Sequence, residues 1–416
     1  MELSLKKNIK THIIPVLIIV SIHIFSAKFT SPVLFDSNEY LSIAQNIQQN
    51  HEYSVSKVNT DDFKEFKGES PTRMRQPVYP LFLYLFIWVF GTTVTFVLFI
   101  QLLLNIISYF LLIEISILVF GGELFIATKY FLSVYFPFWM LSASILTETV
   151  FSFFLIPAVY LLLKETKINN RKLFLFSGLL LGLAFLTRPI ALFVILALGI
   201  AYLFFYPLTK SVKNWGLIFI GFIIVVSPWF IRNVVVFGDA TPLSSDGGYN
   251  FYSATLGVNQ KPWSESNEFK EIVGDGYYID RNASEKFIKK GLSNFYHSPF
   301  TFFINGIKRV FNTWTYFPGT RAFENNGTLY AGTKIIQYLI LATAFIGFVI
   351  GKNKTLVLLI LAPVAGFTFV LLFSYSTSRF LIPIMPFVII LSGQGVKFII
   401  DKAMFMKNIN KNYSGI

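Results

Sequence analysis

The chain of 416 residues contains no cysteine. This absence excludes disulfide bonds, zinc sites built on thiolates and thiol nucleophiles, and it leaves the redox compartment unrecorded. Charge is also scarce, because only 14% of the residues are Asp, Glu, Lys or Arg, whereas soluble domains average about a quarter. No internal repeat or low-complexity tract is visible. The composition therefore excludes an ordinary soluble domain.

Hydrophobic residues make up 54% of the chain, and the mean hydropathy is +0.61. With 48 Phe and 20 Tyr, this composition fits lipid-facing helices flanked by aromatic belts. The net charge of +13 comes from lysines in short loops and at both ends of the chain rather than on one continuous face. Such a distribution favours anionic lipid headgroups over nucleic acid as the partner. We therefore predict an all-α polytopic membrane protein that binds no nucleic acid.

Basic loops set the expected orientation, because short loops rich in Lys and Arg remain in the cytoplasm. The clearest are 164–172, 210–213, 352–354 and the tail from Lys397. The N-terminus resembles a signal peptide, but Phe25 stands two residues before Ala27, where a small-x-small cleavage site requires a small residue. We therefore expect an uncleaved first helix. Counting outward from these loops predicts roughly ten spans with both chain ends inside. They cover about 13–33, 93–119, 124–146, 148–163, 172–188, 190–206, 215–235, 334–350, 355–373 and 380–399.

Two external segments follow from the same count. The apolar run 78–91 is too short to cross a bilayer core of about 30 Å, so we expect it to lie on the outer surface. The long polar insertion 237–332 is expected to hold interfacial helices, one of them amphipathic over 284–296. The predicted organisation is an N-terminal transmembrane catalytic module 1–236 with a first external loop 34–92, the external loop 237–332, and C-terminal helices with a basic cytoplasmic tail over 333–416.

The stretch 35–47 carries Asp36 and Glu39 just after the first apolar span. Apolar side chains at helical spacing over 37–49 predict a helix lying in the membrane interface. Asp36 stands before this helix, so one interpretation is an N-cap. The other is a catalytic carboxylate where the chain leaves the membrane. Glu148 likewise is either a helix cap or a second functional acid.

Arginines gather on the predicted outer rim, opposite to the positive-inside bias. Charges at membrane depth are costly and usually have a partner or a substrate, and guanidinium groups bind phosphate bidentately. Each one alone fits snorkelling or pairing with an acid, but the set favours an anionic substrate. The rim residues are Arg73, Arg75, Arg188, Arg232 and Arg379.

Six motifs in order resemble the C-type membrane glycosyltransferases, a group that includes the lipid A aminoarabinose transferases and the protein O-mannosyltransferases. The resemblance extends from the first helix to about Gly238 and continues more loosely to the end. The motifs are D-x-x-x-Y at 36–40, R-Q-P-x-Y-P at 75–80, T-E at 147–148, G-L-A-F-L-T-R-P at 182–189, P-W-x-x-R-N at 228–233 and R-F-x-x-P at 379–383.

This resemblance implies a sugar donor on a polyprenyl phosphate, inversion at the anomeric carbon and a base in the first external loop, a role that falls on Asp36. The aminoarabinose transferases carry glutamate and lysine ahead of the proline where this chain has Met74 and Arg75, so a metal site using that glutamate is in doubt. A divalent metal stays open as a cofactor, and no nucleotide cofactor is expected. His297 resembles a common external-loop motif, although a lone histidine is more often structural.

The sequence thus predicts an inverting glycosyltransferase of the bacterial inner membrane, with its active site facing outward. It would move one sugar from a polyprenyl phosphate to a hydroxyl on a lipid, glycan or protein and modify the cell envelope, for example its lipopolysaccharide. The rival hypotheses are a transporter or flippase of lipid-linked sugars and a glycan ligase with a polyprenyl-diphosphate donor. The predicted catalytic residues are Asp36 and Glu148, the predicted phosphate ligands are Arg75, Arg188, Arg232 and Arg379, and the secondary candidates are Glu39, Tyr40, Tyr79 and His297.

Overall fold

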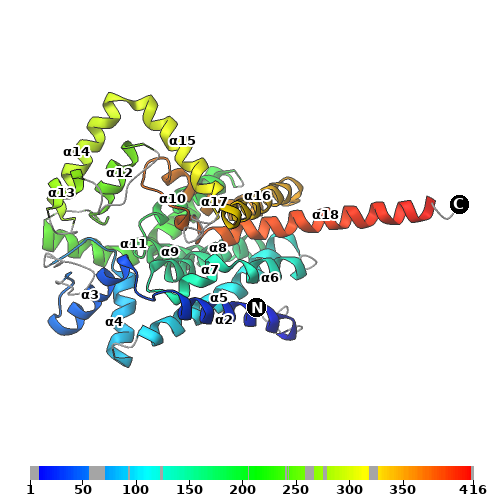
Figure 1. Ribbon diagram of the computed structural model, residues 1–416, viewed down its shortest axis with the longest axis horizontal. Coiled ribbons are helices and arrows are strands. Elements are labelled where there is room, and N and C mark those ends of the chain that lie inside the picture. The colour runs from blue at the N-terminus through cyan, green and yellow to red at the C-terminus, as the bar shows by residue number, and fades with distance from the viewer. Residues whose placement is uncertain are drawn as a thin grey trace.

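The computed structural model describes residues 9–55, 71–91, 94–121, 125–204, 206–238, 241, 243–257, 267–274, 279–317 and 327–413. Every regular element within these ranges is a helix (Figure 1), as predicted from the composition. The α-helices are α2 (Ile13–Phe29), α3 (Phe35–Asn50), α4 (Val78–Phe90), α5 (Val94–Phe120), α6 (Phe125–Val134), α7 (Phe136–Met140), α8 (Thr147–Ile168), α9 (Lys172–Phe185), α10 (Ala191–Leu203), α11 (Leu208–Phe237), α12 (Gly247–Thr255), α13 (Asn267–Val273), α14 (Arg281–His297), α15 (Pro299–Thr315), α16 (Gly327–Ile350), α17 (Lys354–Val370) and α18 (Met385–Tyr413). Short 3-10 segments are η1 (Ile9–His12), η3 (Leu141–Ala143) and η6 (Ser378–Leu381).

Several helices are long and apolar enough to cross a membrane, which makes the chain an integral membrane protein. In the described ranges, five meet this standard: Lys10–Phe29, Val94–Phe120, Thr147–Ile168, Leu208–Phe237 and Ala331–Ile350. Four shorter apolar helices accompany them: Val78–Phe90, Lys172–Phe185, Ala191–Leu203 and Lys354–Val370. A helix lies over nine of the ten predicted spans. Whether each of them crosses the bilayer stays a prediction.

The predicted span 124–146 is not one continuous helix. α6 ends at Val134, Tyr135 leaves the helical region with ψ of 76°, and α7 begins with Pro137 in its first turn. Proline has no N–H to donate, and its ring clashes with the carbonyl four residues earlier. Our prediction of one continuous helix here was therefore wrong, and the chain instead turns through α7 and η3 before α8 begins.

Glycines allow α9 and α11 to approach closely, as the sequence of α9 predicted. A Cβ atom added to Gly178 would stand 2.1 Å from the carbonyl oxygen of Ile218, and one added to Gly221 would stand 2.3 Å from that of Leu175. Any side chain at either position would push the two helices apart. This packing holds α9, which leads into the turn with Arg188, against the rest of the helical bundle.

Helices of the segment 243–317 stand beside the apolar bundle. In Figure 1, α14 and α15 form an arch over α12, and α18 projects far beyond the other helices toward the C-terminus. α14 confirms the amphipathic helix predicted over 284–296. Residues of α12, α13, α14 and the segment before α14 build a small, largely aromatic core of their own, made of Tyr249, Tyr252, Phe269, Ile279, Ala283 and Phe287. α12 is thereby fixed at its position next to the helical bundle.

Candidate functional site

Asp36 lies in the first turn of α3 and is not its N-cap. The helix begins at Phe35, and its N-cap is Leu34. The Leu34 N–H donates to the hydroxyl of Ser37 at 2.8 Å, so Ser37 provides the side-chain acceptor at the start of the helix. The prediction of an N-cap was wrong for this reason, and the Asp36 carboxylate is left to face other parts of the chain.

The beginning of α3 is tied to the beginning of α8. The Ser37 hydroxyl donates to the Ile145 carbonyl at 2.8 Å, and the Ile145 N–H donates to the Pro32 carbonyl at 2.8 Å. Two helices that start more than a hundred residues apart therefore share one anchoring point. Because Glu148 lies in the first turn of α8, this anchor places it near Asp36.

A second anchor places the arginines that precede α4 and follow α9. The Val78 N–H, at the start of α4, donates to the Leu186 carbonyl at 3.0 Å. The hydroxyl of Tyr53 donates to the Arg75 carbonyl at 3.0 Å. The backbone of Arg75 is thus held from one side and the turn leading to Arg188 from the other.

Arg379 lies at the centre of the resulting cluster. Its Nε donates to Oε1 of Glu148 at 2.6 Å, and its Nη2 donates to Oδ2 of Asp36 at 3.0 Å. Arg188 reaches the same Glu148 oxygen at 2.9 Å. Glu148 is only 2% exposed, so a buried carboxylate is shared by two guanidinium groups.

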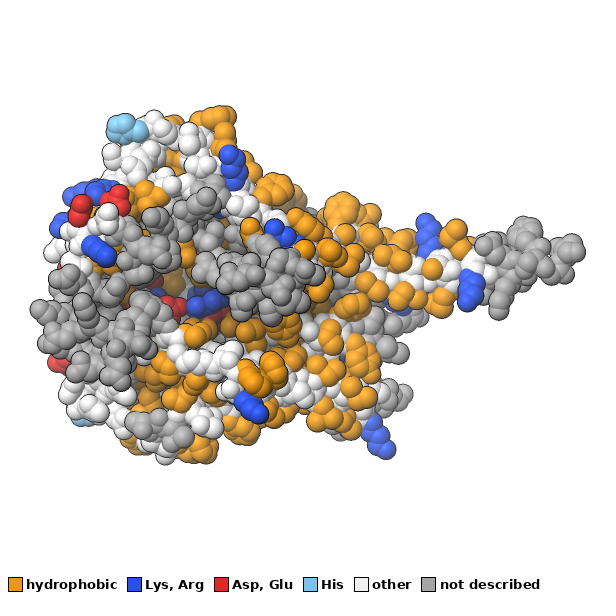
Figure 2. All heavy atoms as spheres, viewed as in Figure 1, with side chains coloured by type: hydrophobic (Ala, Val, Ile, Leu, Met, Phe, Trp, Pro, Cys, Tyr) orange, Lys and Arg blue, Asp and Glu red, His pale blue; other side chains and the backbone are white. Residues whose placement is uncertain are grey.

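Arg75 occupies the other side of the cluster. It forms ion pairs with Glu39 through Nε, with Asp246 at 3.3 Å and with Asp36 at 3.7 Å. Asp36 therefore lies between Arg75 and Arg379, and its side chain is 29% exposed. Figure 2 shows acidic and basic side chains next to one another in a hollow on the face presented there. The predicted residues Asp36, Arg75, Glu148, Arg188 and Arg379 do come together.

Glu39 is the most deeply desolvated acid on the Arg75 side. Its Oε2 accepts from Arg75, while its Oε1 is buried and has no hydrogen-bond partner within the described part of the chain. Burial raises the pKa of Glu39 to about 7, although the neighbouring Arg75 opposes the rise. The pKa of Arg75 is raised in turn, because the attraction of Glu39, Tyr40 and the nearby acids outweighs the effect of its burial.

Asp246 belongs to the cluster and was missed by the sequence analysis. It is the residue before α12, inside a polar insertion with many glycines. Its position before a helix is an ordinary capping signal, and nothing in the motif order links it to Arg75. Only the placement of α12 against the bundle shows the connection.

Tyr40 and Tyr79 form the aromatic wall behind Arg75. Their ring centroids lie 5.0 Å apart, edge to face, and the Arg75 guanidinium lies 5.4 Å from the Tyr40 centroid. The Tyr79 hydroxyl donates to Gln101 at 2.9 Å, and the Gln101 amide donates to two carbonyls ahead of α8. These secondary candidates therefore support the cluster rather than enter it.

Two predicted site residues lie outside the ion-pair cluster. Arg232 packs against the rings of Tyr53, Trp229 and Phe237 and donates to Asn233 at 2.9 Å. His297 is exposed at the end of α14, where its ring nitrogen lies 2.7 Å from the Ser293 carbonyl. Arg232 thus takes part in local aromatic packing, and His297 in a hydrogen bond at the end of its own helix. Neither is seen to contact the acids of the cluster.

The residues of the cluster do not fit a divalent metal as they are arranged. In the ranges that the structure describes, no three His, Asp or Glu side chains are grouped to hold an ion. Asp36, Glu39, Glu148 and Asp246 are each paired with an arginine, and guanidinium groups at these positions repel a cation. The arrangement instead suits an anion that competes with the carboxylates for the arginines.

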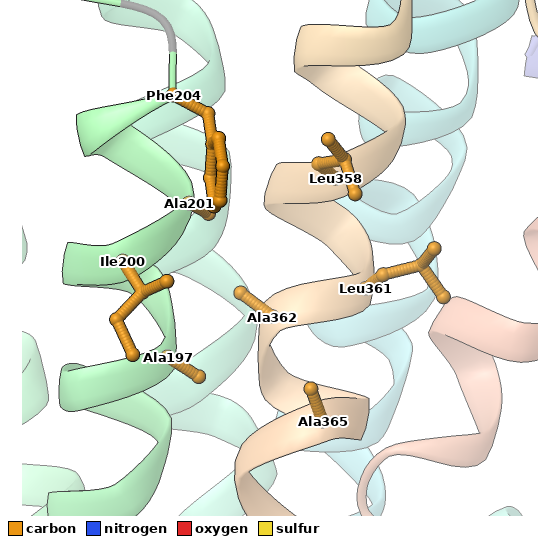
Figure 3. A pocket seen from close by; sticks show the side chains of 8 residues that line it. All are labelled: Ala197, Ile200, Ala201, Phe204, Leu358, Leu361, Ala362 and Ala365. Atoms are coloured by element: carbon orange, nitrogen blue, oxygen red, sulfur yellow. The ribbon is translucent and has the colours of Figure 1, made fainter.

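An apolar pocket of about 360 Å³ lies between α10 and α17 (Figure 3). α10 starts three residues after Arg188, and α17 leads toward the η6 segment that carries Arg379. The pocket lies on the two helices that flank the cluster, toward the end of α10 away from Arg188 and in the half of α17 away from Arg379, and its walls are apolar side chains. Its walls are Ala197, Ile200, Ala201, Phe204, Leu358, Leu361, Ala362 and Ala365.

Comparison with known families finds one match along the chain. Residues 71–231 match the family described as dolichyl-phosphate-mannose-protein mannosyltransferase. This range contains Arg75, Glu148 and Arg188, whereas Asp36 and Arg379 lie outside it. No curated protein sequence matches the chain.

The fold is similar to that of solved membrane proteins. The apo form of the Archaeoglobus fulgidus oligosaccharyltransferase superposes with a TM-score of 0.57 at 14% identity, over 97% of this chain and 52% of that one. The archaeal oligosaccharyltransferase AglB from Archaeoglobus fulgidus, in complex with an inhibitory peptide and a dolichol-phosphate, gives 0.53 at 13% identity, over 98% of this chain and 52% of that one. ArnT from Cupriavidus metallidurans bound to undecaprenyl phosphate gives 0.44 at 11% identity, over 94% and 78%.

The chain spans about half the length of the archaeal enzyme whose fold it shares. The family match and this fold confirm the resemblance to C-type membrane glycosyltransferases that the motifs predicted. The family match also supports the prediction that the chain is a glycosyltransferase enzyme.

Proposed function

We propose that this protein is an inverting glycosyltransferase that moves one sugar from a polyprenyl phosphate to a hydroxyl acceptor. The family match to dolichyl-phosphate-mannose-protein mannosyltransferases supports this class of donor. The archaeal enzyme of similar fold has been solved with a dolichol-phosphate, which is the same kind of lipid. The acceptor is a hydroxyl on a lipid, a glycan or a protein.

The observation that carries the proposal is the position of Asp36 between Arg75 and Arg379. Inverting transfer needs a base for the acceptor hydroxyl and cations for the departing phosphate. Here each of the two cations lies within hydrogen-bond or ion-pair distance of the base. A carboxylate flanked by guanidinium groups provides both parts of this chemistry.

In the proposed step, the acceptor oxygen attacks the anomeric carbon while the bond from that carbon to the phosphate oxygen breaks. The acceptor proton moves to the Asp36 carboxylate. The negative charge that develops on the leaving polyprenyl phosphate is held by Arg379 and Arg75, and Arg188 adds charge from the other side of Glu148. Glu148 holds Arg188 and Arg379 in place, because both contact its Oε1 atom.

The two helices that flank the cluster offer a surface for the lipid part of the donor, toward their ends that lie away from the arginines. The apolar pocket between α10 and α17 has no polar side chain in its walls. From a phosphate held by Arg75 and Arg379, the polyprenyl chain runs along these helices to the pocket, because α10 begins after Arg188 and α17 ends before Arg379. The proposal therefore places the phosphate in the cluster and the prenyl chain on the pocket.

The enzyme is proposed to act on the external face of a bacterial inner membrane, since the basic short loops would keep the opposite face in the cytoplasm. A transporter of lipid-linked sugars would also need arginines for phosphate, but such proteins are commonly built from inverted repeats, and no repeat is visible here. A ligase would differ in the donor, which would be a polyprenyl diphosphate.

Purified protein in lipid nanodiscs, incubated with radiolabelled sugars on polyprenyl monophosphate or diphosphate, tests the proposal directly. The expected result is loss of sugar from the monophosphate donor in the presence of envelope extract from a deletion strain. Mass spectrometry of the labelled product then identifies the acceptor. Consumption of only the diphosphate donor indicates the ligase, and donor movement across the bilayer without consumption indicates the transporter.

A further inference from the structure

Arg309 on α15 is buried without an acidic partner. It is 2% exposed, and no carboxylate within the described ranges forms an ion pair with it. A buried charge with no compensation is costly, and removal of its remaining partners would be strongly destabilising. Burial lowers the pKa of Arg309 to about 10, which still leaves the guanidinium charged at neutral pH.

Backbone carbonyls at the ends of two helices take the place of the missing acid. Nη1 of Arg309 donates to the carbonyls of Ala254 at 2.6 Å and Gly257 at 3.4 Å, at the end of α12. Nη2 donates to the carbonyl of Leu372 at 2.7 Å, just past the end of α17. The last carbonyls of a helix lack partners inside that helix and carry partial negative charge. Arg309 therefore caps α12 and α17 at the same time.

The chain after α17 is held between α15 and α12. Gly306 allows α15 to approach so closely that an added Cβ atom would stand 2.8 Å from the Leu372 carbonyl oxygen. The Thr313 hydroxyl donates to that of Ser376 at 3.2 Å, and the Tyr375 N–H donates to the carbonyl of Asn250 in α12 at 3.0 Å. We call residues 371–377 the α17–η6 connection.

Both structures that Arg309 caps lead to an arginine of the cluster. The α17–η6 connection runs directly into η6, where Arg379 contacts Asp36 and Glu148. α12 starts after Asp246, which forms an ion pair with Arg75. A shift of α12 against the connection would therefore change the separation of the two guanidinium groups that flank Asp36.

We propose that Arg309 is a positioning residue that holds Arg379 and the Asp246–Arg75 pair at the correct separation by capping α12 and α17 together. The proposal rests on the proposed function for its effect on transfer. Its structural part, the clamping of the α17–η6 connection, stands on the contacts alone. Arg309 touches no reacting group, because all its hydrogen bonds go to backbone carbonyls.

Activity measurements test the effect on transfer. Arg309→Gln removes the charge and most of the N–H donors of the guanidinium group. Arg309→Lys keeps the charge, but its single ammonium group cannot replace the planar guanidinium that reaches both helix ends. Both should lower kcat per folded molecule by about 10- to 100-fold, because misplacement by about 1 Å costs this much, with a smaller change in donor KM. Lys308→Gln is the matched control, since this neighbour is exposed, and it should leave kcat unchanged.

A double-mutant cycle separates positioning from a general loss of folded protein. In the Arg379→Lys background, Arg309→Gln should lower kcat much less than in the wild-type background, because the group it positions is already altered. Equal losses in both backgrounds, or an unchanged kcat in both Arg309 variants, overturn the positioning role.

Thiol labelling tests the clamp without reference to activity. Ser376→Cys in this cysteine-free chain should react slowly with a maleimide in full-length protein, and Arg309→Gln should speed the reaction by about 10-fold or more through local opening. An unchanged labelling rate refutes the clamp even if no donor is ever consumed. A wild-type protein that consumes no polyprenyl-phosphate sugar contradicts the proposed function, while the labelling result still decides the role of Arg309.

Discussion

Arg379 and Glu148 are joined by a hydrogen bond of 2.6 Å across 231 residues of sequence. The bond connects the turn after α17 to the first turn of α8, and the second arm of the same guanidinium holds Asp36. One planar group therefore fixes the relative position of two carboxylates on two different helices. Only arginine has the fork geometry for this arrangement.

Arg379→Lys should lower transfer by about 10- to 100-fold while expression is unchanged. Lysine keeps the charge but cannot serve Glu148 and Asp36 together, and a charge-assisted hydrogen bond contributes about 1.5–3 kcal/mol. Donor consumption by purified protein is the measurement. Arg281→Lys is the matched control, because Arg281 is exposed and pairs with Glu285 within α14, and a larger loss there than at position 379 would contradict the assignment.

Asp36→Asn should abolish most transfer, because removal of a general base costs about 10²- to 10⁴-fold in rate. The helix should survive the change, since Ser37 rather than Asp36 satisfies the start of α3. Donor binding, followed by quenching of intrinsic fluorescence, should persist while sugar transfer fails. Glu39→Gln should have a milder effect on rate. Near-normal transfer by Asp36→Asn would move the search for the base to Glu148.

Glu39 should make stability depend on pH near neutrality. Its pKa is about 7 in the folded protein and about 4.3 when unperturbed, so the folded state binds more protons than the unfolded state between these values. Stability therefore falls as pH rises from about 4.5 to 7. Arg75, Asp36, Asp246 and Tyr40 face this carboxyl group and are the charged or titratable groups that modulate it.

The test of this dependence is the unfolding midpoint of Glu39→Gln minus that of the wild type, measured in detergent from pH 5 to pH 8. The difference should rise with pH, because glutamine cannot ionise. Glu285→Gln serves as the control. The pKa of Glu285 is lowered by Arg281, so Glu285 is ionised in both the folded and the unfolded protein across most of this range. The difference in unfolding midpoint between Glu285→Gln and the wild type should therefore not change with pH. A flat difference for Glu39→Gln would show that its carboxyl group does not titrate there.

Ala365→Trp should weaken donor binding by filling the pocket between α10 and α17. Ala365 lines the pocket and is exposed, so the larger side chain need not disrupt the core. The donor KM should rise by about 5- to 30-fold, corresponding to the loss of 1–2 kcal/mol of apolar contact. Ile220→Trp, on the exposed face of α11, is the control. Equal KM values for the two variants would remove the pocket from the donor site.

Single cysteines introduced into this chain should report its orientation. Cysteine at Thr60, which lies outside the described residues, should react with an impermeant maleimide on intact cells. For the insertion that contains the buried Tyr252, cysteine at the exposed Lys289 should react likewise. Cysteine at Asn169, Asn353 or Asn412 should react only after permeabilisation, because basic loops remain in the cytoplasm. Labelling of Asn169→Cys from outside would reverse the predicted orientation.

Local patterns in the sequence predicted individual elements well. Periodicity predicted the helices now seen as α3 and α14, and the glycines of α9 predicted its close packing. The rim arginines were identified because charge is rare in this chain, so each one near a span needed an explanation. The break at Tyr135 was missed, because hydrophobicity alone extends through Pro137.

Partnerships between distant residues were the part that the sequence could not supply. Nothing local distinguishes Arg232, which packs on rings, from Arg379, which bridges two acids. Asp246 resembled a turn residue until α12 was placed. Asp36 had the position of a cap, but the Ser37 hydroxyl accepts the Leu34 N–H and also donates to the carbonyl of Ile145, in the segment before α8. Which residue takes a pairing or capping role depends on three-dimensional contacts rather than on spacing along the chain.

α18 has a practical consequence for handling this protein. It runs from Met385, four residues after the η6 segment of Arg379, to Tyr413 without a break, and Figure 1 shows it projecting away from the other helices. At 1.5 Å per residue its 29 residues measure about 43 Å. A fluorescent protein or affinity tag fused beyond this helix is therefore kept far from the cluster, so it should report on abundance and allow purification without obstructing catalysis.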